Sequence, residues 1–228
     1  MASPISKLFS QTALYGLPSI LGRLLNYLLV PLYTAVFAKP ADYGVLSDLY
    51  AYIAFLVVLL PLGMETAYFR FIQNHDKPDH VFNNSFFPVL FLNILFFLGI
   101  YLSNPIIAKW MLYEDHAEFI LIVGSIVCLD AVASLPLAKL RAENRARKFV
   151  LIQFSAIGTN ILLNLIFLLG FFNPERPEEG ILFILIANLC SSAVKLFLVS
   201  DILRPLKFTF DWPLVKSMLI YALPLVIA

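Results

Sequence analysis

Residues 149–172 read FVLIQFSAIGTNILLNLIFLLGFF, an apolar run that contains no charged residue. A helix that crosses the roughly 30 Å hydrocarbon core of a bilayer needs about 20 such residues. Within a single segment, only an α-helix pairs all of its own backbone polar groups in the absence of water. The run therefore predicts a membrane-spanning helix.

The rest of the chain repeats this pattern, with short polar connections between the apolar runs. The predicted spans are 13–37, 44–69, 85–108, 117–138, 149–172 and 180–203, and a seventh run begins near Leu214. The chain is 61% hydrophobic and only 14% charged, whereas soluble domains carry about 25% charged residues. We expect an all-α, polytopic integral membrane protein, with a six-helix transporter lobe over residues 1–208 and the start of a seventh helix over residues 209–228.

Lysine and arginine are distributed unevenly between the two sets of loops. One set holds Lys7, Arg70, Lys77, Lys139, Arg141, Arg145, Arg147, Lys148, Arg204 and Lys207, and the other holds Lys39, Lys109 and Arg176. Short cytoplasmic loops carry the excess of basic residues, so we expect a cytoplasmic N-terminus. The basic run 141–148 could also bind nucleic acid or lipid head groups. We interpret it as a loop that sets topology, and expect no nucleic-acid partner.

A short motif occurs near both ends of the chain: YGLP at residues 15–18 and YALP at residues 221–224. Both copies would begin on the cytoplasmic side, which predicts two parallel repeats of six helices, an arrangement found in many transporters. The chain would then hold the first repeat and the first turns of the second. Helices seven to twelve, the C-terminal lobe, are expected to be missing from it, so that it would be a fragment of a longer parent protein.

The first predicted span carries a cation too deep to reach water. Arg23 lies about 3 Å from the expected midplane at 1.5 Å of rise per residue, so its side chain must face the protein interior or a wet cavity. Polar and small residues share its face: Thr12, Gly16, Ser19, Asn26, Tyr33 and Thr34. Arg23 is therefore either a buried ion satisfied by a carboxylate or carbonyls, or a cationic group that lines a substrate cavity.

Three other spans carry polar residues at membrane depth. They are Asp130 in the fourth span, Gln153, Asn160 and Asn164 in the fifth, and Asn188, Ser191, Ser192 and Lys195 in the sixth. Asp130 could pair with Arg23 or couple transport to a proton or sodium gradient, and Lys195 could nearly reach the interface. The amides and hydroxyls could serve only as interhelical hydrogen bonds. Taken together, the stripes predict a cavity lined by the first, fifth and sixth spans. Prolines at positions 18, 31, 61 and 136 predict kinks.

Several stretches resemble a known family. Residues 43–47 (YGVLS) and 62–70 (LGMETAYFR) resemble the second helix of bacterial polysaccharide flippases, and Gly22-Arg23 and residues 221–224 fit the same pattern. The chain is similar to the O-antigen type of these flippases, within the superfamily of multidrug, oligosaccharidyl-lipid and polysaccharide exporters.

The resemblance implies two six-helix lobes that alternately open a central cavity to each side of the bacterial inner membrane. The substrate would be an oligosaccharide on a polyprenyl diphosphate, used for lipopolysaccharide or another surface polysaccharide. Arg23 and Lys195 would bind the diphosphate, and Asn26, Asn160 and Asn164 would bind the sugars. Besides this substrate and membrane lipids, possible proton or sodium coupling is expected. Covalent chemistry, a cofactor and a metal are not expected, so the protein would not be an enzyme.

Two other functions remain open at the level of sequence. A cation-coupled multidrug exporter of the same superfamily would need an acidic cation site, for which Asp130 is available, although Arg23 disfavours cationic drugs. A non-transporting membrane scaffold would have its polar stripes satisfied entirely by neighbouring helices. A homodimer could replace a missing second lobe, but the short seventh run makes this a poor explanation.

Overall fold

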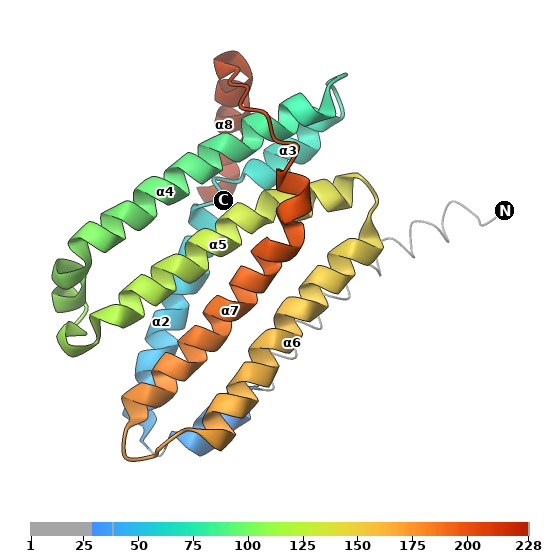
Figure 1. Ribbon diagram of the computed structural model, residues 1–228. Helices are drawn as coiled ribbons and strands as arrows, with labels where there is room; N and C mark the ends of the chain where they lie inside the picture. The colour runs from blue at the N-terminus through green and yellow to red at the C-terminus, as the bar shows by residue number, and fades with distance from the viewer. Residues whose placement is uncertain (1–28, 38, 228) are drawn as a thin grey trace. The chain divides into compact units, whose positions relative to one another are not determined.

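The computed structural model describes residues 29–37 and 39–227, and this part of the chain is α-helical (Figure 1). Its elements are α2 (Pro40–Leu59), α3 (Met64–Ile72), α4 (Pro78–Trp110), the 3-10 helix η1 (Glu114–His116), α5 (Ala117–Ala142), α6 (Ala146–Gly170), α7 (Pro177–Leu203) and α8 (Trp212–Ile227). Residues 29–36 form a further stretch of helix. The expected all-α class is confirmed.

The described residues contain five helical segments long and apolar enough to cross a membrane. These are Pro40–Ile72, Pro78–Trp110, Glu114–Ala142, Ala146–Gly170 and Pro177–Leu203. The sequence predicted six full spans, and that number is not reached, because the first predicted span, 13–37, lies mostly outside the described residues. The seventh run forms a shorter apolar helix, Trp212–Val226. The chain is a multi-pass membrane protein by helix length and hydropathy.

The second predicted span is interrupted between α2 and α3. Pro61 lacks an N–H and cannot continue the helical hydrogen bonding, and Leu62 and Gly63 adopt left-handed φ angles of 56° and 64°. Turn hydrogen bonds bridge the gap, from Leu62 N to Leu59 O at 3.0 Å and from Met64 N to Pro61 O at 2.9 Å. The proline predicted a kink here, and the structure has a full break. Pro136, by contrast, lies inside the continuous helix α5.

The chain forms two compact units, and each is described by itself. Unit 1 comprises residues 1–47 and 140–198, and unit 2 comprises residues 48–139 and 199–228. The described part of unit 1 therefore includes helix 29–36, α6 and most of α7. Unit 2 includes most of α2 and α5, all of α3 and α4, and α8.

Within unit 2, helix α3 packs against both α4 and α8. Met64, Ala67 and Tyr68 form its buried face, since residues three and four apart lie on one side of a helix. At the far end of α3, the Arg70 guanidinium lies 4.3 Å from the centroid of the Tyr221 ring on α8. The break at Gly63 also abuts α8, because a Cβ built there would lie 2.9 Å from the carbonyl oxygen of Ala222.

Replacement of Gly63 by alanine is therefore expected to destabilise unit 2. The left-handed conformation costs an L-residue about 1–2 kcal/mol, and the clash with Ala222 O adds about 1–3 kcal/mol of overpacking. The measurement is the free energy of unfolding in detergent micelles. Gly99→Ala on α4 is the matched control, since a Cβ there meets nothing within 4 Å. Equal stability of the two variants would contradict this packing.

Candidate functional site

A chain of buried hydrogen bonds joins helix 29–36 to α6 inside unit 1. The Tyr33 hydroxyl donates to Asn164 Oδ1 at 3.1 Å, and Asn164 Nδ2 donates to Asn160 Oδ1 at 2.6 Å and to Asn160 O at 2.8 Å. Asn164 is fully buried, while Tyr33 and Asn160 are 5% and 8% exposed. The contact brings polar groups from two helices together in one buried cluster, which we call the amide chain (Tyr33, Asn164 and Asn160).

The order of donors and acceptors fixes the orientation of both amides. An amide has one carbonyl oxygen and two N–H donors. Asn164 therefore accepts the hydrogen bond from Tyr33 through Oδ1 and donates to Asn160 through Nδ2. Asn160 must then accept through Oδ1. Within the described residues, Asn160 Nδ2 donates no hydrogen bond. The amide chain therefore ends in Asn160 Nδ2, from which a polar ligand could accept a hydrogen bond.

Helix α7 is joined to α6 one turn away from the amide chain. The Ser191 hydroxyl donates to the carbonyl oxygen of Ala156 at 2.7 Å, and the bond is buried. This is the interhelical hydrogen bonding that the sequence left open as an alternative role for such residues. Ser191 is thus used for packing α7 on α6.

The predicted site residues are distributed as follows. Arg23 and Asn26 lie outside the described residues. Asn160 and Asn164 are in direct contact, and Lys195, on α7 of the same unit, is half-buried. Asp130 is half-buried on α5 and belongs to unit 2. The structure brings Asn160 and Asn164 together and adds Tyr33, which the sequence placed on the polar face of the first span but did not include among the site residues.

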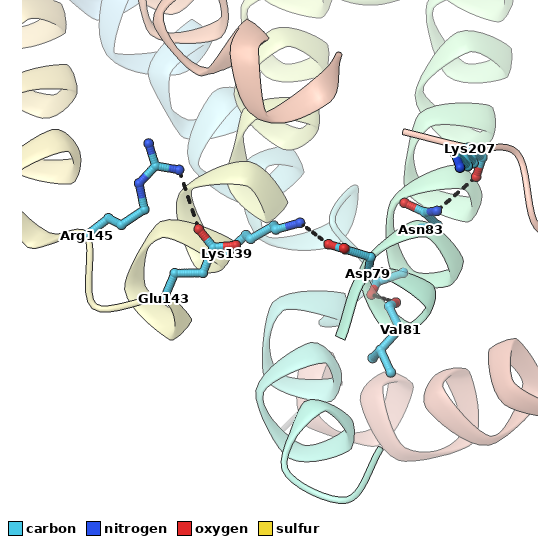
Figure 2. A network of polar contacts seen from close by, with 8 residues as sticks. Asp79, Val81, Asn83, Lys139, Glu143, Arg145 and Lys207 are labelled. Atoms are coloured by element: carbon cyan, nitrogen blue, oxygen red, sulfur yellow. Dashed lines mark hydrogen bonds and ion pairs between the residues drawn. The ribbon is translucent and has the colours of Figure 1, made fainter. Parts of the chain in front are cut away.

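Sequence reasoning missed a second polar cluster, at the beginning of α4 in unit 2 (Figure 2). Lys139 Nζ lies 2.6 Å from Asp79 Oδ1 and 4.6 Å from the centroid of the Phe82 ring. Lys139 was counted as a loop cation, but it lies on α5 and is only 9% exposed. Its carboxylate partner is separated by 60 positions in sequence, so no local pattern could have indicated the pair.

The same end of α4 holds the segment that leads into α8. Asn83 Nδ2 donates to the carbonyl oxygen of Lys207 at 2.9 Å (Figure 2), and Asn84 Oδ1 accepts from the backbone N–H of Asp211 at 2.7 Å. Asp211 in turn caps α8 by accepting from Leu214 N at 3.2 Å. Consecutive asparagines at the start of an apolar helix were the signal in the sequence, because amides at such a position bind neighbouring backbone.

A third polar contact lies at the opposite end of α4. The Tyr113 hydroxyl, in the connection between α4 and η1, donates to Asp48 Oδ2 at 3.0 Å. Burial, followed by the hydrogen bond and the negative charge of Asp48, raises the pKa of Tyr113 from 10.0 to about 12. The contact ties this connection to α2 within unit 2.

The amide chain predicts measurable coupling between Tyr33 and Asn164. A double-mutant cycle of Tyr33→Phe and Asn164→Leu in detergent unfolding should give a coupling energy of about 0.6–1.7 kcal/mol, the range for interhelical bonds in membrane proteins. Tyr33→Phe combined with Thr159→Ala is the control, because within residues 29–37 and 39–227 the Thr159 hydroxyl bonds only to Ser155 O of its own helix. A coupling energy no larger than the control value would exclude the bond.

The pH dependence of stability should report the Tyr113–Asp48 contact. The folded-state pKa is the higher one, so the contribution of Tyr113 is fully present below pH 10 and is lost between pH 10 and about 12. The measurement is the tyrosinate absorbance of the wild type minus that of Tyr113→Phe, together with unfolding at each pH. Asp48→Asn should lower the pKa of Tyr113. An unchanged titration in Asp48→Asn would refute this assignment.

Comparisons with known proteins supply the identity of the family. No curated protein and no solved structure matches the chain. A family model described as polysaccharide biosynthesis protein matches residues 35–228, a range that includes the five described spans and α8. The apolar spans agree with this match, and the chain therefore belongs to the polysaccharide biosynthesis protein family of membrane proteins.

Proposed function

We propose that the protein is part of a flippase that moves polyprenyl-diphosphate-linked oligosaccharides across the bacterial inner membrane by alternating access. The observation that carries the proposal is the family match over residues 35–228, which includes every described span. The sequence resemblance to O-antigen flippases points to the same substrate class. In this proposal residues 1–208 form one six-helix lobe with a cytoplasmic N-terminus, and residues 209–228 begin the second lobe.

The chemistry of such a substrate explains why polar groups would be needed at membrane depth. A glycan hydroxyl transferred to hydrocarbon without a hydrogen bond costs roughly 4–8 kcal/mol, so the path must supply partners. Asn160 supports this role, since its Nδ2 donates to no other residue in the described part of the chain. Asn164 would hold Asn160 in position, and Asn26 would add a further amide.

A diphosphate would need cations, because charged acceptors form their strongest hydrogen bonds with ionised donors. Arg23 offers a planar fork of donors that matches phosphate oxygens, and Lys195 would add a second positive charge. Transport of this kind forms no covalent bond, so no nucleophile is required. Asp130 is the proposed coupling group, whose protonation or sodium binding would drive the cycle.

Complementation of a bacterial strain that lacks its O-antigen flippase tests the proposal. The full-length gene should restore O-antigen on the cell surface, and Arg23→Ala or Asn160→Leu should reduce the restored transport roughly 10–100-fold, as expected for a lost hydrogen bond to a charged or buried partner. Thr159→Ala, beside Asn160 on α6, is the control. Full transport by both site variants at equal protein level would refute the proposed substrate contacts, and failure of the wild type would refute the function.

The coupling role of Asp130 has its own measurement. Transport into vesicles should depend on an imposed proton or sodium gradient in the wild type, and Asp130→Asn, which cannot ionise, should remove that dependence. Asp48→Asn, on another helix of the same unit, is the control and should keep it. A gradient dependence that survives in Asp130→Asn would exclude Asp130 as the coupling group.

A further inference from the structure

An apolar groove of about 540 Å³ runs between α4 and α8 on unit 2. Phe87, Leu90 and Ile94 line it from α4, and Val215 and Leu219 line it from α8. Val215 is almost fully buried and forms part of the floor, whereas Ile94 is 55% exposed at the rim. The groove is therefore open along its side and has a packed base.

The segment between α7 and α8 completes the groove with aromatic side chains. Phe208, Phe210 and Trp212 occupy alternate positions in an irregular stretch that ends at the start of α8, and alternate residues of an extended chain point to the same side. Phe208 packs against Phe87 at a centroid distance of 4.9 Å, and Phe210 stacks on Trp212 at 6.1 Å. All three rings are more than half exposed.

The polar anchors of this segment determine where the groove begins. Asn83 and Asn84 hold the backbone of residues 207 and 211 at the first turns of α4, and the lining starts one turn later at Phe87. From Phe87 to Ile94 the helix rises about 10 Å, which is about a third of the roughly 30 Å hydrocarbon core. The groove is therefore too short for a transmembrane helix, and its length fits part of one acyl chain.

Two exposed lysines adjoin residues that line the groove. Lys216 is four residues after Trp212 and three before Leu219, so it shares their face of α8, and it is exposed. Lys207 is also exposed and directly precedes Phe208. The nearby Asp211 carboxylate is engaged by Leu214 N and lies 3.9 Å from His80 Nε2. The Asp211 side chain is 40% exposed and keeps its negative charge, so two lysines and one aspartate leave a formal charge of +1 on these three side chains.

We propose that this groove is a binding site for an anionic phospholipid, with one acyl chain between α4 and α8 and the head group beside Lys207 and Lys216. Charge complementarity with the two lysines selects an anionic head group, and the short groove selects an acyl chain over a transmembrane helix. The site would couple the position of α8 to the anionic lipid of the surrounding leaflet. It is independent of the proposed transport function.

The two tryptophans of the chain, Trp110 and Trp212, make the site directly observable. Trp110→Phe leaves Trp212 as the only reporter, in full-length protein reconstituted into nanodiscs that contain phospholipids alone. Phosphatidylglycerol brominated on its acyl chains should quench Trp212 with an apparent affinity at least about fivefold higher than brominated phosphatidylcholine, the preference expected for one lysine near an anionic head group. Trp212→Phe leaves Trp110, which is 83% exposed at the other end of α4, and should show no preference.

Two sets of variants separate the head group from the chain. Lys207→Gln with Lys216→Gln should remove the preference but keep quenching, and Ile94→Phe should reduce quenching by both lipids because it fills the groove. Ile106→Phe, which is on α4 and 59% exposed, should change neither. Equal quenching of Trp212 by both lipids would overturn the site for anionic lipid. Absence of Trp212 quenching would show that protein covers the groove. Displacement of the brominated lipid by stoichiometric polyprenyl phosphate would assign the groove to an isoprenoid chain. Either result overturns the proposal.

Discussion

The hydrocarbon core offers no water, so each backbone polar group that lies within it must find its partner in the protein. The break between α2 and α3 demonstrates this constraint. Pro61 interrupts the helical hydrogen bonds, and two residues with left-handed φ follow. Turn bonds pair the freed groups, and Gly63 lies against the backbone of α8 at Ala222. The break between α2 and α3 is tolerated because other segments of the protein cover it. The contacts of α3 with α4 and α8 provide this cover.

The same constraint marks a boundary on α4. Asp79, Asn83 and Asn84 bind side chains or backbone from α5 and from the segment before α8. One turn later, at Phe87, the surface of the helix becomes apolar. A polar anchor and an apolar groove thus follow each other along one helix, which is the order expected for a helix that passes from water into hydrocarbon. The connection before α8 is held at that boundary by its backbone, which leaves its aromatic rings directed to the groove.

The sequence was sufficient for the parts of the structure that depend on local pattern. Span length and apolar content located the five spans to within about four residues, except that α4 begins at Pro78 and not at the predicted residue 85. This succeeds because each helix must satisfy its own backbone in the bilayer. Position along the chain was insufficient to predict the environment of Lys139. Its place between two apolar runs indicates a loop cation, but the side chain is buried and pairs with Asp79. Nor could it predict that Leu62 would adopt a left-handed φ. Both features arise from neighbours that are distant in sequence. The amide chain was predicted in part, since the spacing placed Asn160 and Asn164 on one stripe but did not indicate Tyr33 as their partner.

A polar stripe on a membrane helix therefore contains residues with two different roles. Asn164 uses its carbonyl oxygen toward Tyr33 and its nitrogen toward Asn160. Because a buried polar group left unpaired costs about 1–3 kcal/mol, a ligand that displaced either bond would have to replace it. Among the residues that the structure describes, Asn160 bonds only through its oxygens, so a ligand that accepts from its nitrogen breaks none of the bonds described. Asn164, which bonds to both Tyr33 and Asn160, is thus the poorer candidate for substrate contact. Asn160, one turn away on the same helix, is the better candidate.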